Sequence, residues 1–287
     1  MTTLSASQDG PEPGGFQLDE IGPANYDAWL VPRFFAPLAD RLMESTPPRS
    51  GEHALDLACG TGVVTRRVAD LAGPAGRVIG VDINSAMIDF AGSREGRERS
   101  AAERSPIEWL VGDSGHLPVP AAWADICYCQ QGWQFFTDQR KSAQELARVC
   151  RPGARVALTI WRAIEHNPVF SLLAETLDQE IGHVAAATMR APFAGPTKSA
   201  LREQLTAAGF DRIAVRILLL EVRFPSVSVF LRQEAAGSPL GTVLQRETED
   251  VLVALTRSLD QSLGPYLDED GLILPMQTWL VTARRAV

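Results

Sequence analysis

A turn of small residues next to an acidic side chain is the part of this sequence best suited to chemistry. Asp56 lies at the end of a short apolar run, and Ala58, Gly60 and Gly62 follow it before a helical pattern begins. Glycine lets a backbone approach a ligand closely, and the free N–H groups of a helix's first turn face that ligand. Because the Asp56 carboxylate would repel a phosphate and attract an amino group, the pattern favours a cationic cofactor over a dinucleotide.

Two further acids follow similar apolar runs. Asp82 ends the run 77–82, roughly twenty residues after the turn, which is the spacing at which a carboxylate meets ribose hydroxyls. Asp113 follows the run 107–111, where it can accept a hydrogen bond from an adenine amine. A single acid at such a place often caps a helix instead. Three acids at successive strand ends favour a cationic nucleoside, and S-adenosylmethionine fits.

A dinucleotide-binding dehydrogenase is the main competing interpretation. Gly60 and Gly62 with a distal acid satisfy the weak form of its fingerprint. The third glycine is missing, because Thr65 stands at that place. Asp56 and Asp113 also have no role in a nicotinamide site. The sequence therefore disfavours this class.

The length, hydrophobic content and net charge of the chain limit the kinds of partner it can bind. The chain has 287 residues, of which 45% are hydrophobic, enough for one large domain with a sizeable core. Its net charge of −8 argues against a nucleic-acid partner, which clustered Lys and Arg would bind. We find no apolar stretch long enough for a membrane span and no secretion signal at the start, so we expect a cytoplasmic protein without a membrane partner.

The four cysteines do not indicate a disulfide framework. Cys59, Cys127, Cys129 and Cys150 fall within expected strands, the small-residue turn or a helix end, so we expect reduced thiols. A zinc site would need a second cysteine pair or a histidine cluster nearby. We therefore expect no metal.

Strands and helices alternate along most of the chain. This order predicts an α/β fold with a doubly wound, mostly parallel, Rossmann-like sheet, preceded by a helical segment over 26–43. We expect a disordered tail over 1–16 and a single domain over 17–287, with helical lid insertions at 162–200 and 225–270. The expected strands are 54–57, 77–82, 107–111, 124–129, 155–161, 212–223 and 276–284.

The sequence resembles the class I S-adenosylmethionine (SAM)-dependent methyltransferases, in particular the group similar to ubiquinone/menaquinone-biosynthesis methyltransferases. The resemblance extends from about residue 26 to residue 285 and is specific for fold and cofactor rather than for substrate. One departure is Ala58, where the class usually has Gly. The matching segments are 56–62, 81–84, 112–113, 129–136, 151–153, 191–193 and 207–210.

This resemblance implies a set of cofactor contacts. Asp56, Ala58, Gly60 and Gly62 would surround the methionine part of SAM, and Asp82 would hold the ribose. The other implied contacts are Ile83 and Met87 beside the adenine, Asp113 on its amine with Ser114 next to it, Gln130 and Gln131 toward the sulfonium, and Tyr26 over the carboxylate end.

The function implied is methyl transfer from SAM to carbon or oxygen of a small molecule, such as a natural product or quinone, with S-adenosylhomocysteine as the second product. Methyl transfer needs alignment and a dry site rather than an enzyme nucleophile. If the acceptor must lose a proton, His166 is the first candidate base and His116 the second, although each could be an ordinary loop histidine. Trp133 and Trp161 follow strand ends and could wall the acceptor pocket, which we expect beside the lid of 162–200.

Other classes on the same fold stay open. A SAM-binding enzyme that does not methylate, such as a cyclase, would carry the same cofactor site, and so would a cofactor-binding regulatory protein. A nucleic-acid methyltransferase is disfavoured, because Gln130-Gln131-Gly132 replaces the Asn/Asp-Pro-Pro-aromatic motif after the fourth strand. The expected partner is a small-molecule acceptor, and a homo-oligomer is left open.

Overall fold

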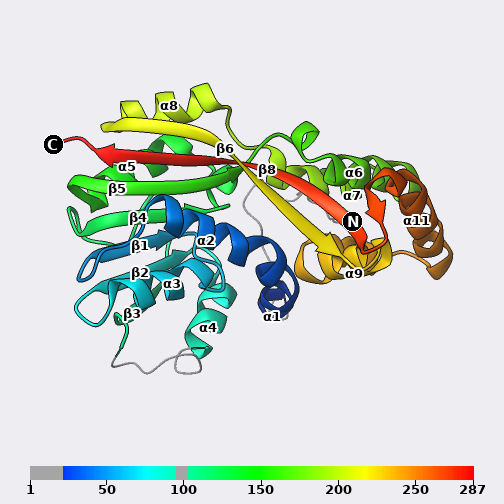
Figure 1. Cartoon of the computed structure of the whole chain (residues 1–287), viewed down its shortest axis with the longest axis horizontal. Coiled ribbons are helices and arrows are strands. Elements are labelled where there is room, and N and C mark those ends of the chain that lie inside the picture. The colour runs from blue at the N-terminus through cyan, green and yellow to red at the C-terminus, as the bar shows by residue number, and fades with distance from the viewer. Residues whose placement is uncertain (1–21, 95–102) are drawn as a thin grey trace, which may run out of the picture.

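The computed structural model describes residues 22–94 and 103–287. The expected tail over 1–16 lies outside the described residues. Within them the chain forms one sheet with helices on both faces, and a second group of helices lies beyond one end of the sheet (Figure 1). The α/β prediction is therefore confirmed.

The sheet has the order β3-β2-β1-β4-β5-β8-β6, and β7 pairs with β8. Strands β1 to β5 are parallel, whereas β8 runs antiparallel between β5 and β6. The order reverses between β1 and β4, where ligands of open α/β sheets bind. The strands are β1 (His53–Leu57), β2 (Arg77–Asp82), β3 (Ile107–Val111), β4 (Ala124–Gln130), β5 (Cys150–Trp161), β6 (Phe210–Phe224), β7 (Leu267–Asp268) and β8 (Gly271–Arg285).

Alternating residues of the strands build a core on each face of the sheet. Ala54 and its neighbours on one face pack against α2 and α3, and Leu55 and its neighbours on the other face pack against α5 and α8. Helix α4 lies beside β2 and β3. These helices are α2 (Ala36–Ser45), α3 (Val63–Ala72), α4 (Ser85–Ser93), α5 (Gln139–Val149) and α8 (Lys198–Ala207).

The N-terminal segment is helical, but not as one regular α-helix. Helix α1 (Gly22–Asn25) leads into the π-helical η1 (Tyr26–Phe35), which continues into α2. Pro32 lies inside η1, where it has no N–H to donate and where its ring would clash with the carbonyl of residue i−4 in a regular α-helix. The irregular stretch includes Tyr26 and lies at the site described below.

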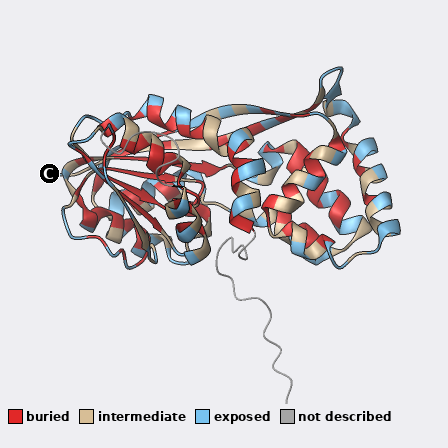
Figure 2. Ribbon diagram, turned by 90° about the horizontal axis from the view of Figure 1, so that it is seen from below, coloured by how far each residue is buried: buried red, intermediate tan, exposed pale blue. Residues whose placement is uncertain are grey.

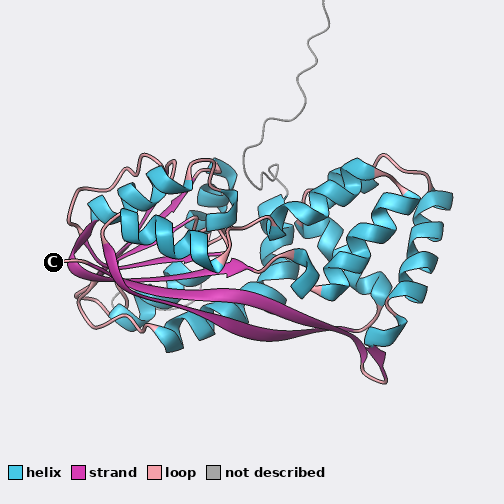
Figure 3. Ribbon diagram, turned by 90° about the horizontal axis from the view of Figure 1, so that it is seen from above, coloured by secondary structure: helices cyan, strands magenta, loops and turns pink. Residues whose placement is uncertain are grey.

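Strand β8 begins at Gly271, well before the expected start at residue 276, whereas β6 extends its expected bounds by only one or two residues at each end. They pair from Phe210↔Arg285 to Phe224↔Leu272, whereas β5 pairs with β8 only as far as Trp161. The rest of the two-stranded ribbon leaves the sheet and reaches the second group of helices (Figure 3). It is stable there because Phe224 and its neighbours are buried against those helices.

We call this second group of helices the cap. Figure 2 shows buried residues on the facing sides of its helices, which form a hydrophobic core of their own. Leu30 and Phe34 of η1 also belong to this core. Because β6 runs in the same direction as β1 to β5 and leads into the cap, the cap lies at the carboxyl ends of the parallel strands. Its helices are α6 (Pro168–Glu180), α7 (His183–Arg190), α9 (Val227–Gly237), α10 (Leu240–Leu244) and α11 (Glu249–Ser262), with short turns η3 (Ile164–His166), η4 (Ala191–Phe193) and η5 (Gly264–Tyr266). Over the described ranges, we find no helix with the length and apolar character to cross a bilayer.

Candidate functional site

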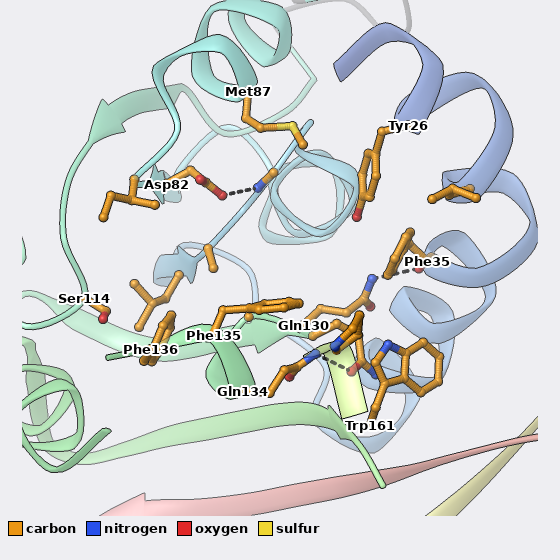
Figure 4. A pocket seen from close by; sticks show the side chains of 18 of the residues that line it. Tyr26, Phe35, Asp82, Met87, Ser114, Gln130, Gln134, Phe135, Phe136 and Trp161 are labelled. Carbon is orange, nitrogen blue, oxygen red and sulfur yellow. Dashed lines mark hydrogen bonds between the residues drawn. The ribbon is translucent and has the colours of Figure 1, made fainter. Parts of the chain in front are cut away.

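One cavity lies where the ends of β1 to β5 meet η1 and the cap. Figure 4 shows the side chains of Asp82 and Tyr26 on opposite sides of its open space, with Met87 between them at one edge. Of the residues predicted from sequence to form the site, those that line the cavity are Tyr26, Ala58, Gly60, Asp82, Ile83, Met87, Asp113, Ser114, Gln130, Gln131 and Trp161.

The turn after β1 adopts left-handed backbone at three positions. Ala58, Gly60 and Gly62 have φ values of 56°, 54° and 88°. A side chain at Gly62 would collide with the Trp109 ring, so only glycine fits there without rearrangement. Gly62 caps α3 behind the turn and does not itself line the cavity.

Asp82 is held in one orientation by backbone donors. Its Oδ2 accepts a hydrogen bond from the Gly60 N–H at 2.8 Å, and its Oδ1 accepts one from the Asn84 N–H at 2.9 Å. Asn84 also caps α4 by accepting hydrogen bonds from the Ala86 and Met87 N–H groups. Burial raises the pKa of Asp82, and the backbone N–H groups oppose that rise. The carboxylate keeps free lone pairs for a ligand.

Asp56 lies beneath the turn rather than in the cavity lining. Its Oδ2 accepts a hydrogen bond from the Thr65 hydroxyl at 2.6 Å, and only 1% of the residue is exposed. Burial raises the pKa of Asp56 to about 7, and the negative charge of Asp82 adds to the rise. Thr65 and the Arg66 guanidinium act in the opposite direction. Asp56 can therefore influence a ligand electrostatically through the turn.

Asp113 and Ser114 line the end of the cavity near β3. Asp113 Oδ1 accepts a hydrogen bond from the Gly115 N–H at 2.6 Å, which leaves the exposed carboxylate further acceptor capacity. The Ser114 hydroxyl is 2.8 Å from that of Ser142 on α5. Ile83 is 55% exposed and Met87 is buried, so together they offer an apolar edge next to these polar groups.

Gln130 presents a buried acceptor at the end of β4. Its Nε2 donates to the Phe35 carbonyl at 2.9 Å, as Figure 4 shows, while its buried Oε1 has no hydrogen-bond partner in the part of the chain that the structure describes. Gln131 turns away toward β8 and donates to the Thr278 hydroxyl at 3.0 Å. Tyr26 stacks on Phe35 with ring centroids 5.0 Å apart.

The aromatic residues after β4 are arranged differently from the expectation. Trp133 is fully buried in the core beneath the site and does not line the cavity. Phe135 and Phe136 line it instead, because the short helix η2 (Trp133–Phe135) turns successive side chains in different directions. Trp161 lines the cavity as expected and packs against Phe193, with centroids 6.2 Å apart.

Neither candidate histidine lies in the cavity lining. His116 is exposed in the turn after β3, where it pairs through its backbone with Asp113. His166 is exposed on η3, and its Nε2 is 2.8 Å from the Arg162 guanidinium. Arg162 in turn pairs with Gln277 on the outside of the ribbon. A strand-end position therefore does not bring these two side chains to the cavity.

The structure adds one titratable residue that sequence reasoning missed. Glu234 on α9 lines the cavity and is only 7% exposed. Burial raises its pKa to about 7, and a hydrogen bond with Ser238 opposes the rise. A signal was present in the sequence, because Glu234 continues the apolar stripe formed by Phe230 and Leu231 on its helix.

The residues described provide no metal cluster and no disulfide. No group of three or more His, Cys, Asp or Glu side chains within residues 22–94 and 103–287 is arranged to hold an ion. The four cysteines are free and buried, and the thiols of Cys127 and Cys150 are 3.4 Å apart. Contacts to a ligand can come from the backbone of the turn after β1, from Asp82 and from Gln130.

These groups fit SAM. The unpartnered Gln130 Oε1 can accept a bond from the cofactor's amino group, and Asp82 can accept bonds from two ribose hydroxyls. Left-handed backbone at Gly60 brings the turn close to the ligand without a Cβ in the way. The cavity thus has acceptors for both ends of the molecule.

Comparison with known sequences supports this assignment. A family model described as a methyltransferase domain matches residues 55–158. Nocamycin O-methyltransferase of Saccharothrix syringae is 31% identical over 218 residues, which cover 72% of this chain and 75% of that protein. Demethylmenaquinone methyltransferase of Lactobacillus johnsonii is 33% identical over 124 residues, covering 43% of this chain and 49% of that protein. The chain thus spans about half the length of the second relative.

Solved structures show the same fold. Phosphoethanolamine N-methyltransferase 2 of Haemonchus contortus, in complex with SAM, matches with a TM-score of 0.58 and 18% identity over 93% of this chain and 57% of that one. The cyclase SpnF matches with a TM-score of 0.51 and 22% identity over 88% of this chain and 82% of that one. At this level of sequence identity, these structures show only that the fold is the same. Together with the relationship to the nocamycin enzyme, they establish that the chain belongs to the class I SAM-dependent methyltransferases.

Proposed function

We propose that this methyltransferase acts on a small, flat and mostly apolar acceptor held between the sheet and the cap. One observation carries the proposal: the cavity that contains Asp82 and Gln130 continues into a compartment under the cap with aromatic walls. Trp161, Phe170 and Phe193 belong to those walls. Such a compartment suits a ring system rather than a nucleic acid or a charged peptide.

The polar end of the cavity would hold SAM. We assign the ribose to Asp82, the amino group to Gln130 Oε1, and the adenine to the edge formed by Ile83 and Met87, with Asp113 near its exocyclic amine. Tyr26 would close over the carboxylate end. Bound SAM supplies a methyl group already activated on a sulfonium.

The compartment under the cap would hold the acceptor. Its lining is rich in aromatic and methionine side chains, including Phe34 and Met276, and the cap covers it. Alignment in such a site contributes on the order of 7 to 11 kcal/mol to lowering the barrier of a bimolecular step. The printed names of the relatives, a nocamycin O-methyltransferase and a demethylmenaquinone methyltransferase, support an acceptor of the natural-product or quinone type, methylated at oxygen or carbon.

The test combines cofactor binding with methyl transfer. Calorimetry should show binding of SAM and S-adenosylhomocysteine, and SAM with a labelled methyl group should pass its label to a member of a panel of polyketides and hydroquinones. Trp161→Ala should weaken acceptor binding without changing SAM affinity. Trp123→Ala serves as the control, because Trp123 is partly buried and does not line the cavity. Conversion of a panel member without label transfer would instead favour a non-methylating enzyme such as a cyclase.

A further inference from the structure

Glu234 is a carboxylate where the helix pattern calls for an apolar residue. The buried face of α9 consists of Val227, Phe230, Leu231, Glu234 and Gly237. Gly237 packs so closely on Leu30 of η1 that a side chain at this position would collide with it, which holds this face of α9 against the cavity wall. The carboxylate lies on that face and lines the cavity.

No positive charge balances Glu234 inside the cavity. Among the described residues that line it, none is Lys, Arg or His, and the other titratable groups, Asp82, Asp113 and Tyr26, belong to the cofactor end. The hydroxyl of Ser238, one turn along, is its hydrogen-bond partner. Burying a carboxylate without a cation is costly, and an aliphatic side chain at this position would pack without that cost. Such a placement is typical of a functional residue.

We propose that Glu234 is the general base of the reaction and that the acceptor is a neutral phenol or enol methylated on oxygen. This inference rests on the proposed function. In the step, the hydroxyl O–H bond breaks and its proton passes to a Glu234 carboxylate oxygen. The oxygen's electron pair forms the new bond to the methyl carbon, and the pair of the breaking C–S bond remains on sulfur. A sulfonium and a carboxylate become a neutral thioether and a carboxylic acid, so the charges balance.

A hydroxyl acceptor fits these charges better than an amine. A protonated amine would place a second positive charge beside the sulfonium, with Glu234 as the only anion on the cap side of the described cavity lining. A neutral hydroxyl adds no charge, so the positive charge of the sulfonium is balanced by the negative charge of Glu234. The raised pKa of about 7 also places Glu234 near the value at which a general base works best in neutral solution.

The first experiment identifies the methylated atom. Purified protein is incubated with SAM carrying a labelled methyl group and either naphthohydroquinone, which offers oxygen and ring carbon, or the matched naphthalenediamine. We expect the methyl ether of the hydroquinone. Transfer to ring carbon or to nitrogen would overturn this inference and leave the proposed function standing. Protein that binds SAM but methylates neither probe would also overturn it, whereas failure to bind SAM would overturn the proposed function itself.

The second experiment assigns the base. Glu234→Gln keeps the size of the side chain and should lower kcat by roughly 10²- to 10⁴-fold with SAM affinity unchanged. Glu249→Gln, on the exposed face of α11, is the matched control. In the wild type, kcat/KM should rise with pH through about 7 as Glu234 loses its proton.

Two variants separate Glu234 from Asp56, whose pKa lies in the same range. The rise should vanish in Glu234→Gln and move to higher pH in Ser238→Ala, because the Ser238 hydrogen bond lowers the pKa of Glu234. If kcat/KM still rises with pH through about 7 in a folded Glu234→Gln protein, the assignment is overturned even if activity falls. A fall in activity alone would fit a structural role of Glu234, and only loss of the pH dependence identifies Glu234 as the base.

Discussion

The methyl group of Ala58 occupies the space into which a side chain on Gly132 would project. Ala58 has left-handed backbone in the turn after β1, and Gly132 follows β4, so the two residues meet across the point where the strand order reverses. A Cβ on residue 132 would lie closer to the Ala58 Cβ than two carbons can approach. Having alanine where the class usually has glycine is therefore accommodated by the glycine that follows the neighbouring strand β4.

We expect Gly132→Ala to destabilise the protein and weaken SAM binding, because one side of the cofactor turn must move. The backbone at Gly132, with φ −101° and ψ −34°, would accept alanine. Ala58→Gly together with Gly132→Ala should thus recover most of the loss. Urea unfolding of the four proteins measures the coupling energy, which we expect to be about 0.5 to 3 kcal/mol. Additive effects of the two substitutions would contradict this packing.

Asp82→Ala should weaken SAM binding by about 1.5 to 3 kcal/mol, because charge-assisted hydrogen bonds to the ribose are lost. Asp82→Asn should have a smaller effect, since its amide oxygen can still accept the bond from the Gly60 N–H. Asp89→Ala, an exposed acid on α4, is the control. Calorimetric titration with SAM checks all three proteins, and unchanged affinity in folded Asp82→Ala would refute the ribose assignment.

The cofactor end of the site could be predicted because a parallel sheet gathers its strand ends at one edge. Once Asp82, Asp113 and Gln130 are assigned to strand ends, topology alone brings them to one cavity. The turn could also be predicted from local sequence, because glycine adopts the left-handed backbone found at Gly60 and Gly62 more readily than other residues. Their roles as ligands stay predictions.

The cap end could not be predicted in the same way. Glu234 reaches the cavity because α9 packs on η1, a contact between segments about two hundred residues apart in the chain that no local period encodes. Trp133 and the two histidines illustrate the opposite case. They follow strand ends, but a single turn of backbone directs Trp133 into the core and leaves His116 and His166 in solvent. Proximity along the chain does not set side-chain direction in loops.

Asp56 should make the ligand-free protein less stable as pH rises from about 4 to about 7. The ordinary pKa of its side chain is 3.8, and burial raises the pKa to about 7 in the folded protein. Between these values the folded protein holds a proton that the unfolded chain has released, so the free energy of unfolding falls by up to about 1.4 kcal/mol per pH unit. Below the lower value both states are protonated and the contribution is constant.

Asp56→Asn should remove this part of the pH dependence. Glu234 contributes in the same direction, since its pKa is also raised to about 7, so the difference between wild type and variant is the relevant quantity. Urea unfolding at several pH values measures it. We expect the variant to gain stability relative to the wild type as pH increases toward neutral, and two parallel curves would show that Asp56 ionises normally in the folded state.

His116→Ala and His166→Ala should each keep kcat within about threefold of the wild type, because exposed substitutions outside the cavity disturb little. His166 contacts Arg162, and the Arg162 guanidinium is 4.6 Å from the centre of the Trp279 ring on β8. His166 therefore contributes to packing on the outer surface of the ribbon rather than to the cavity. The same methyl-transfer assay that tests Glu234→Gln compares all three variants. A loss of 10²-fold or more in either histidine variant, with full activity in Glu234→Gln, would transfer the role of base from the cap to that histidine. It would also require the strand-end loop to fold inward when the acceptor binds.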